Sequence, residues 1–262
     1  MMRINEVREH APLVLCITND VVKNFTANGL LALGASPIMA IDEAELEELI
    51  EHCGAVLINI GTLSTAVMPS IETAIQAANK HHVPVVLDPV ACGATNFRKE
   101  FCLKLLRQYH ISVIRGNASE LQSLSAEVAM KGTDSDTSLN TAVVARAAGE
   151  YFNTAVVVTG AIDAVYVDGT VMKLANGTPM LTKVTGGGCL LGAIVSAFIY
   201  NEVKPTLSML TEAVSFYNIA AERAAQRDNG TLPGHFQINL LDMLQETGES
   251  EIAENMRAEE VD

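Results

Sequence analysis

The sequence predicts an α/β protein in which a central, mostly parallel sheet is flanked by helices on both faces. Short apolar runs alternate with longer helical stretches as far as Gly160, an order typical of parallel strands joined by right-handed crossovers. Most of these runs are continuously apolar, as expected for strands covered on both faces. Hydrophobic residues make up 49% of the 262 residues, enough for a large buried core. We expect one domain over residues 1–262, because no linker or internal repeat divides the chain.

The elements of the first part of the chain follow from these patterns. Gly34 and Gly54 come directly after two helical stretches, where glycine commonly ends a helix. The expected strands are 13–18, 55–61, 83–88, 111–115 and 154–159. The expected helices are 20–33, 43–53, 70–80, 97–109 and 139–152.

The pattern changes in the last part of the chain. Residues 164–174 (AVYVDGTVMKL) contain a central Asp-Gly pair and predict an antiparallel hairpin at the edge of the sheet. Long apolar stretches predict helices over 189–202 and 207–227. Residues 246–262 carry seven acids and one arginine, so we expect a solvated helix end or a frayed tail.

Composition disfavours several classes of partner. There are 31 acidic and 17 basic residues, and the net charge of −14 argues against binding to nucleic acid or to an anionic membrane. The N-terminus has no apolar signal segment, and the longest apolar run, 189–200, is shorter than the about 20 residues that span a bilayer. The five cysteines show no metal-site spacing and their odd number favours a reducing compartment. We expect a soluble, cytoplasmic protein.

The strongest local signal is VTGGGCLLGA at 184–193, where three glycines precede an apolar helical run. Glycines let the backbone approach an anion, and a helix N-terminus supplies free N–H donors, so the segment predicts a phosphate site. A flexible turn before a buried helix is the alternative. No Lys-Ser/Thr pair follows, so the segment is not a Walker loop, and it lies outside an N-terminal βαβ unit, so it is not a dinucleotide fingerprint.

Cys189 lies in the first turn of that helix, where the thiol pKa is expected to fall below its free value of about 8.5. From position alone it could be a base, a nucleophile or a small core residue. Asp88 ends another apolar strand, in VLDPVACGA at 86–94. A carboxylate at the carboxyl end of a parallel strand lies where α/β proteins bind ligands, which favours a metal or catalytic role, although Asp88 could also cap the next turn.

Two further strands end in polar residues. In IRGNASE at 114–120, Asn117 and Glu120 have the spacing of a helix capping box, and the same helix start could bind a metal-bound phosphate. Both functions can hold together. VVVTG at 156–160 ends in a hydroxyl and a glycine, which taken alone indicates only a strand end.

Taken together, the motifs resemble the hydroxyethylthiazole kinases of the ribokinase-like superfamily, from about Pro12 to Leu244. The order of the motifs is more specific than any one of them. The matching segments are TNDVV at 18–22, TANGLLALGASPIM at 26–39, NIGTL at 59–63, LDPVACGA at 87–94, IRGNASE, VVVTG and TKVTGGGC at 182–189.

The resemblance implies phosphorylation of the primary alcohol of 4-methyl-5-(2-hydroxyethyl)thiazole by ATP with Mg²⁺, a salvage step toward thiamine. It also implies a homotrimer with thiazole sites near the subunit contacts. Met39 and Gly186 match substrate-site positions, and Arg115 and Thr159 match ATP-binding positions. Cys189 stands where related kinases place an aspartate base.

The remaining site residues also follow from the resemblance. Asn117 and Glu120 match the superfamily's NxxE element, which organises Mg²⁺ and phosphates, and Asp88 lies where a metal-organising carboxylate is expected. The N–H groups of 186–188, including Gly187 and Gly188, would stabilise the transferring phosphoryl group.

Two segments leave details open. GTLPGHF at 230–236 departs from the Gly-Pro-Gly-Ser-Phe-like stretch of the family, which puts the local contacts in doubt. KGTDSDTS at 131–138 predicts a mobile loop that could close over nucleotide.

Three other functions compete with this assignment. The nearest is a hydroxymethylpyrimidine or sugar kinase of the same fold, against which the cysteine at 189 and the TNDVV and SPIM segments argue. The second is an ATP-dependent hydrate dehydratase, a lyase on a related fold. The third is a nucleotide-binding regulator without catalysis.

Overall fold

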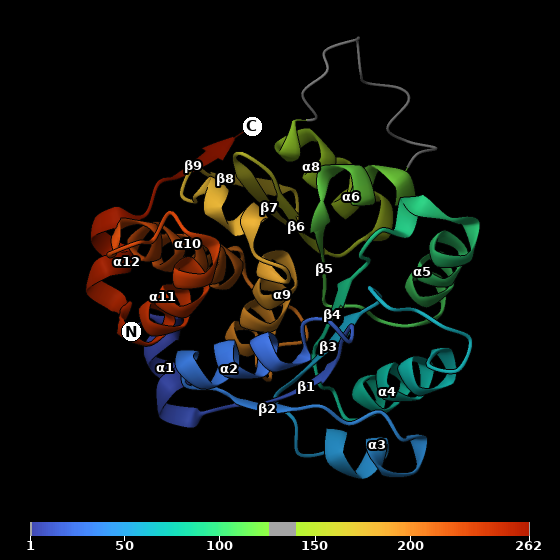
Figure 1. Ribbon diagram of the computed structural model, residues 1–262. Coiled ribbons are helices and arrows are strands. Elements are labelled where there is room, and N and C mark those ends of the chain that lie inside the picture. The colour runs from blue at the N-terminus through green and yellow to red at the C-terminus, as the bar shows by residue number, and fades with distance from the viewer. Residues whose placement is uncertain (1, 126–139, 262) are drawn as a thin grey trace.

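The computed structural model describes residues 2–125 and 140–261. In this part of the chain, the strands form a nine-stranded sheet in the order β2-β1-β3-β4-β5-β6-β7-β8-β9 (Figure 1). Neighbours from β2 through β6 are parallel, and β7, β8 and β9 are added antiparallel. The strands are β1 (Leu13–Ile17), β2 (Ser36–Ile38), β3 (Ala55–Asn59), β4 (Val85–Asp88), β5 (Val113–Asn117), β6 (Ala155–Thr159), β7 (Asp163–Val167), β8 (Thr170–Leu174) and β9 (Ala258–Val261).

Helices cover both faces of the sheet, as the sequence predicts (Figure 1). One layer is α1 (Arg3–His10), α2 (Lys23–Leu33), α9 (Gly187–Phe198), α10 (Leu207–Gln226), α11 (Pro233–Glu246) and α12 (Glu249–Asn255). The other is α3 (Glu43–Ile50), α4 (Met68–Lys80), α5 (Asn96–Gln108), α6 (Ala118–Leu124) and α8 (Thr141–Phe152). Alternate strand residues supply the two cores: Val14 and Cys16 face the first layer, and Leu15 and Ile17 face the second.

The five predicted parallel strands are confirmed, with ends that differ by up to two residues. The predicted hairpin is also confirmed, because Val167 pairs with Thr170 across a turn at Asp168 and Gly169. Both turn residues have positive φ, +46° and +90°, as a two-residue hairpin turn requires. The hairpin is not at the edge of the sheet, however, since β9 lies outside it.

The expectation for residues 246–262 is wrong over most of the segment. After α11 ends, α12 buries Ile252 completely, and β9 pairs with β8 from Val171 to Leu174. The open edge of β8 offers backbone hydrogen bonds that even a polar sequence can satisfy. The acidic side chains of β9 meanwhile stay in solvent. Composition alone therefore underestimates the order of this segment.

Some expectations cannot be placed. The loop at 131–138 lies outside the described residues, as does the first residue of the helix expected at 139–152. Among the residues that the structure describes, no helix combines the length and apolar character needed to cross a bilayer.

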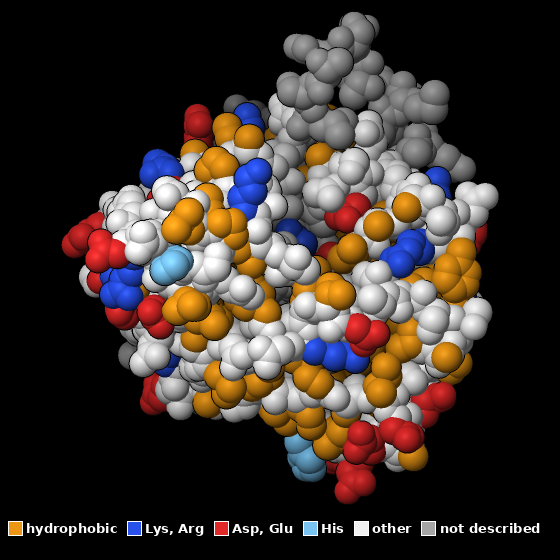
Figure 2. All heavy atoms as spheres, viewed as in Figure 1, with side chains coloured by type: hydrophobic (Ala, Val, Ile, Leu, Met, Phe, Trp, Pro, Cys, Tyr) orange, Lys and Arg blue, Asp and Glu red, His pale blue; other side chains and the backbone are white. Residues whose placement is uncertain are grey.

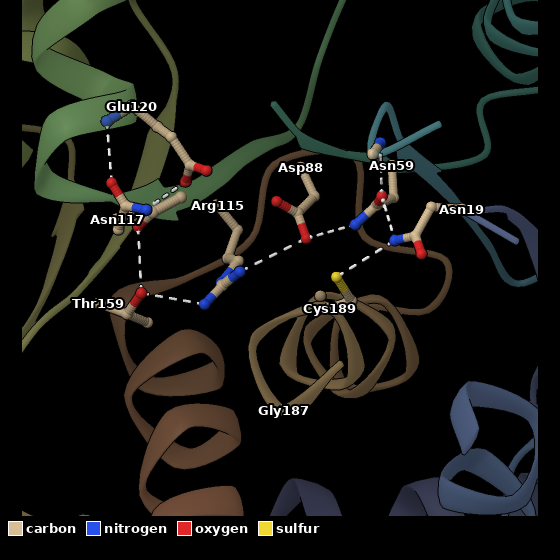
Figure 3. Close-up of polar contacts among 12 residues, drawn as sticks. Asn19, Asn59, Asp88, Arg115, Asn117, Glu120, Thr159, Gly187 and Cys189 are labelled. Carbon is tan, nitrogen blue, oxygen red and sulfur yellow. Dashed lines mark hydrogen bonds and ion pairs between the residues drawn. The ribbon is translucent and has the colours of Figure 1, made fainter. Parts of the chain in front are cut away.

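The layout of the sheet determines where a site can form. β1, β3, β4, β5 and β6 run parallel, so their carboxyl ends meet at one edge. Helix α9 packs on β1, β3 and β4, and its N-terminal turn brings Cys189 to that edge (Figure 3). Polar residues that are distant in sequence therefore come together there.

Candidate active site

The candidate site is a row of polar side chains along the carboxyl edge of the sheet (Figure 3). They lie in or directly after five neighbouring parallel strands, and Cys189 faces them from the first turn of α9. Its members are Asn19 after β1, Asn59 in β3, Asp88 in β4, Arg115 and Asn117 in β5, and Thr159 in β6.

A continuous chain of hydrogen bonds joins Cys189 to Thr159. Asn19 Nδ2 donates to Cys189 Sγ at 3.4 Å and to Asn59 Oδ1 at 2.9 Å. Asn59 Nδ2 donates to Asp88 Oδ2 at 2.8 Å, and Arg115 Nη1 lies 3.4 Å from the same oxygen. Arg115 Nη2 donates to Thr159 Oγ1 at 3.0 Å. The chain holds a thiol, a carboxylate and a guanidinium in fixed relation.

Asp88 is fully buried, and its surroundings change its protonation. Burial raises its pKa to about 6, and the charge of Glu120 acts in the same direction, while Arg115 and the hydrogen bond from Asn59 oppose the rise. Asp88 Oδ1 has no hydrogen-bond partner among the described residues. The carboxylate is therefore ionised at neutral pH and has one oxygen left to bind a cation.

The thiol of Cys189 does not have the lowered pKa expected from its place in the helix. Burial raises its pKa, and the negative charge of Asp88 adds to the rise. The amides of Asn59 and Asn19 and the charge of Arg115 act in the opposite direction without outweighing burial. Cys189 is therefore mainly a neutral thiol at rest, held among donors that stabilise a thiolate if one forms.

Asn117 and Glu120 form the predicted capping box at the start of α6. Asn117 Oδ1 accepts from Glu120 N at 2.9 Å, and Glu120 Oε2 accepts from Asn117 N at 2.8 Å. Glu120 Oε1 also accepts from Ala91 N at 2.8 Å, which ties the loop after β4 to this helix. The structural interpretation is thus confirmed, and the carboxylate remains close enough to Asp88 to raise its pKa.

The glycine turn before α9 presents fewer free donors than the sequence suggests. Gly186 caps the helix at φ +87°, and Gly187 N donates to Val184 O at 3.3 Å. Within the described residues, the N–H groups of Gly188 and Cys189 have no acceptor. A Cβ at position 188 would lie 3.0 Å from Arg115 Nη2, so glycine lets the guanidinium reach the helix start.

Two cavities adjoin this row of side chains, and Figure 2 shows the surface hollowed near the middle of the view. The Arg115 cavity, of about 630 Å³, is lined by Arg115, Thr159, Gly187, Gly188 and Tyr217, with residues of the β6–β7 turn and of the segment after β8. The Asn59 cavity, of about 540 Å³, is lined by Asn59 with residues from β1, α3 and the loop after β3. The hydrogen-bond chain connects them, because Asn59 lines one cavity and Arg115 and Thr159 line the other, while Cys189 lines neither.

The structure does not bring every predicted residue into this row. Met39 follows β2, is half-buried and packs against the core on the α9 side, and it lines neither cavity. Gly186 lies at the helix start, but a Cβ there would meet Val22 Cγ1 at 2.6 Å, so its environment is apolar. Substrate binding by these two residues stays a prediction.

Three residues of the site are missing from the sequence prediction. Asn19 and Asn59 lie within the matching segments TNDVV and NIGTL, Asn19 just after the predicted strand 13–18 and Asn59 near the end of the predicted strand 55–61, and that position is the available signal. Tyr217 in α10 donates to Gly187 O at 2.6 Å and lines the Arg115 cavity. Nothing in its apolar helix indicates this contact.

The residues present fit a magnesium ion held jointly with phosphate. The part of the chain that the structure describes contains no cluster of three or more His, Cys, Asp or Glu side chains able to hold a metal. Asp88 nevertheless has an unpartnered buried oxygen, and the Glu120 carboxylate is nearby. Mg²⁺ typically binds one or two carboxylates and completes its shell with water and substrate phosphates.

Comparisons with known proteins find relatives over nearly the whole length of the chain. The model of the "Hydroxyethylthiazole kinase family" matches residues 4–249. A hydroxyethylthiazole kinase of Macrococcus caseolyticus is 59% identical over the full length of both chains. The structure of the Pyrococcus horikoshii hydroxyethylthiazole kinase is similar with a TM-score of 0.90 at 40% identity, over 99% of this chain and 98% of that one. A hydrate dehydratase of Bacillus subtilis shares the fold alone, with a TM-score of 0.59 at 14% identity over 93% of this chain and 96% of that one.

Proposed function

The chain belongs to the hydroxyethylthiazole kinase family, and on this basis we propose how its site transfers a phosphoryl group. The reaction is the ATP-dependent phosphorylation of the primary alcohol of 4-methyl-5-(2-hydroxyethyl)thiazole, a thiamine salvage step. The observation that carries the proposal is the hydrogen-bond chain from Cys189 to Arg115, which lies between two cavities. Two substrates bound on either side would meet at this chain.

ATP occupies the Arg115 cavity in this proposal. Arg115 and Thr159 bind its phosphates, and Gly187 and Gly188 leave room for them beside the helix start. Phosphoryl transfer depends mainly on positioning and on neutralising charge, and a buried guanidinium beside two free N–H groups supplies both.

The thiazole alcohol binds on the other side, toward the Asn59 cavity, with Met39 and Gly186 contacting the ring. Cys189 lies beside the alcohol oxygen and accepts or orients its proton. The transition state of phosphoryl transfer is loose, so the alcohol loses its proton late and needs only modest base assistance. The thiol form of Cys189 orients the alcohol, and the thiolate form, which the hydrogen bond from Asn19 to Sγ stabilises, accepts the alcohol's proton and becomes a neutral thiol.

Magnesium completes the charge balance. Asp88 and Glu120 would hold Mg²⁺ through their carboxylates and water, and Asn117 orients Glu120 through the capping box. When bound, the ion would offset the negative charge of the phosphates. Without a cation, two carboxylates beside a triphosphate would repel it.

The assembly and location are also part of the proposal. We infer a homotrimer with thiazole sites near subunit contacts. Supporting it, Ile41 is 46% exposed while lining the Asn59 cavity, and Val21, which follows the lining residue Asp20 in the chain, is 73% exposed. All five cysteines are free, which agrees with a reducing cytoplasm.

The test is ADP release coupled to a spectrophotometric assay, with and without the thiazole alcohol. We expect alcohol-dependent ADP formation and a stoichiometric phosphorylated alcohol. Inorganic phosphate with a dehydrated nicotinamide cofactor would indicate the lyase instead. A preference for hydroxymethylpyrimidine would indicate the related kinase, and nucleotide binding without turnover would indicate a regulator.

A further inference from the structure

Part of the wall of the Arg115 cavity comes from the segment between β8 and α9, and this segment is hydrogen-bonded to the C-terminal segment. Asn176 lines the cavity and is only 3% exposed. Its Nδ2 donates to Asn255 O at 3.0 Å and to Glu222 Oε2 at 3.2 Å, and its Oδ1 accepts from Arg257 N at 2.7 Å. One buried amide thus joins the cavity wall, α10 and the chain that follows α12.

Glu222 connects the same three parts through its other oxygen. Glu222 Oε1 accepts from the backbone N of Gly177 at 2.7 Å and from Arg257 Nη2 at 2.5 Å. Arg257 Nη2 also donates to Ala175 O at 3.0 Å. Gly177 has a φ of +139°, a conformation open to glycine and strained for other residues, and the hydrogen bond to Glu222 holds it there. Asn176, Glu222 and Arg257 are called the wall cluster below.

The anchored wall reaches the place where phosphates are proposed to bind. Asn176, Gly177 and Leu181 all line the Arg115 cavity. A Cβ at Gly187 would lie 2.8 Å from Leu181 O, so the wall packs directly on the first turn of α9. Loss of the anchor would therefore change both the width of the cavity and the support of that turn.

We propose that the wall cluster is a set of positioning residues for ATP, acting through the wall rather than by touching the phosphates. The proposal rests on the proposed binding of nucleotide in the Arg115 cavity. The match to the family model ends at residue 249, and the segment that carries Arg257 lies beyond it.

The test compares Arg257→Ala with Arg146→Ala in the full chain. Arg146 also holds the C-terminal strand, because its Nη2 donates to Val261 O at 3.3 Å, but it does not contact the cavity wall. For Arg257→Ala we expect the KM for ATP and the Kd for a non-hydrolysable ATP analogue to rise about 3- to 10-fold, as for loss of a hydrogen bond to a partly exposed charged group. The KM for the thiazole alcohol should stay within about twofold, and Arg146→Ala should match the unaltered chain.

Two more variants separate positioning from general weakening of the fold. Glu222→Gln removes the negative charge that accepts hydrogen bonds from Gly177 N and Arg257 Nη2. We expect it to raise the KM for ATP and the Kd for the analogue at least as much as Arg257→Ala does. Arg257→Lys keeps a cation near Glu222 and should restore most of the affinity. Equal ATP affinity in all variants, or equal losses in Arg257→Ala and Arg146→Ala, would overturn the proposal. If the unaltered chain fails to bind the analogue, the nucleotide assignment itself is wrong, and the proposal with it.

Discussion

The guanidinium of Arg115 and the carboxylate of Asp88 form a buried ion pair with 3.4 Å between Nη1 and Oδ2. Asn59 donates to the same oxygen, and Arg115 is held from its other side by Thr159. The second oxygen, Oδ1, has no partner within the described residues. The pair thus places a fixed positive group next to an unused carboxylate oxygen, the two kinds of group that a metal-bound phosphate needs.

We expect the pH dependence of kcat/KM for ATP to reflect the protonation of Asp88. Burial raises its pKa from 3.8 to about 6, so the carboxylate becomes protonated as the pH falls through about 6, where an ordinary aspartate stays ionised. We therefore expect kcat/KM for ATP to fall below that pH, because this ratio reflects the free enzyme. Asp88→Asn should be slower at every pH and lack this acidic limb. If the variant kept the same fall in kcat/KM at acidic pH, that fall would belong to another group.

Substitution of Arg115 and Met39 should affect different substrates. Arg115→Ala should raise the KM for ATP about tenfold or more, because charge-assisted hydrogen bonds are lost. Met39→Ala should raise the KM for the thiazole alcohol about fivefold or more, because each buried methylene contributes about 0.8 kcal/mol. Steady-state kinetics with each substrate varied in turn measures both. If either variant raised the KM for ATP and the KM for the thiazole alcohol equally, the assignment of Arg115 to ATP and Met39 to the alcohol would be contradicted.

Glu120→Gln should weaken magnesium use without unfolding α6. Glutamine can keep the capping-box bond from Asn117 N, but it lacks the charge that attracts a cation and the second carboxylate oxygen, which accepts from Ala91 N. We expect the Mg²⁺ concentration for half-maximal activity to rise about tenfold, in line with the loss of one charged ligand contact. The unfolding temperature, measured as a control, should change little. A Mg²⁺ titration identical to that of the unaltered chain would exclude the metal role.

Cys189→Ala and Cys189→Ser should slow kcat about 100-fold and leave ATP binding nearly unchanged, since a late proton transfer needs only modest base assistance. Cys189→Asp should remain active, because a carboxylate can take the same proton. Rapid-quench kinetics and mass spectrometry of the protein during turnover provide the measurements. A phosphorylated Cys189, or an alanine variant as fast as the unaltered chain, would rule out this role.

Gly188→Ala should weaken ATP binding through Arg115. The new Cβ would lie 3.0 to 3.1 Å from the two Nη atoms, which forces the guanidinium away from the helix start. We expect the KM for ATP to rise about 3- to 10-fold, since the displaced side chain makes charge-assisted hydrogen bonds. Gly234→Ala is the matched control, because nothing lies within 4 Å of a Cβ there. Equal kinetics in the two variants would mean that Arg115 adapts freely.

The sequence predicts the centre of the fold better than its edges. β1, β3, β4 and β6 are nearly continuous apolar runs and β5 begins as one, and burial on both faces is what such runs require. β2 has only three residues, too few for any periodicity. β9 reads AEEV and becomes a strand only because β8 offers an open edge, which depends on tertiary structure.

The sequence likewise predicts only part of the candidate site. Asp88, Arg115 and Thr159 meet as expected, because the carboxyl ends of parallel strands share one edge. Asn19 and Asn59 have neutral amides that indicate no chemistry by themselves, and their function arises only from contacts with each other and with α9. The raised pKa of Cys189 likewise depends on burial, which helix position does not reveal.

The five cysteines differ in exposure, so chemical labelling of one of them can report on the site. Four are buried, and Cys189 alone is partly exposed. An alkylating reagent added to the folded chain would therefore label Cys189 before any other cysteine, although slowly, because its thiol is mostly protonated. Under the proposed function, a bound alcohol would protect Cys189, so the extent of labelling would measure occupancy of the site without any turnover.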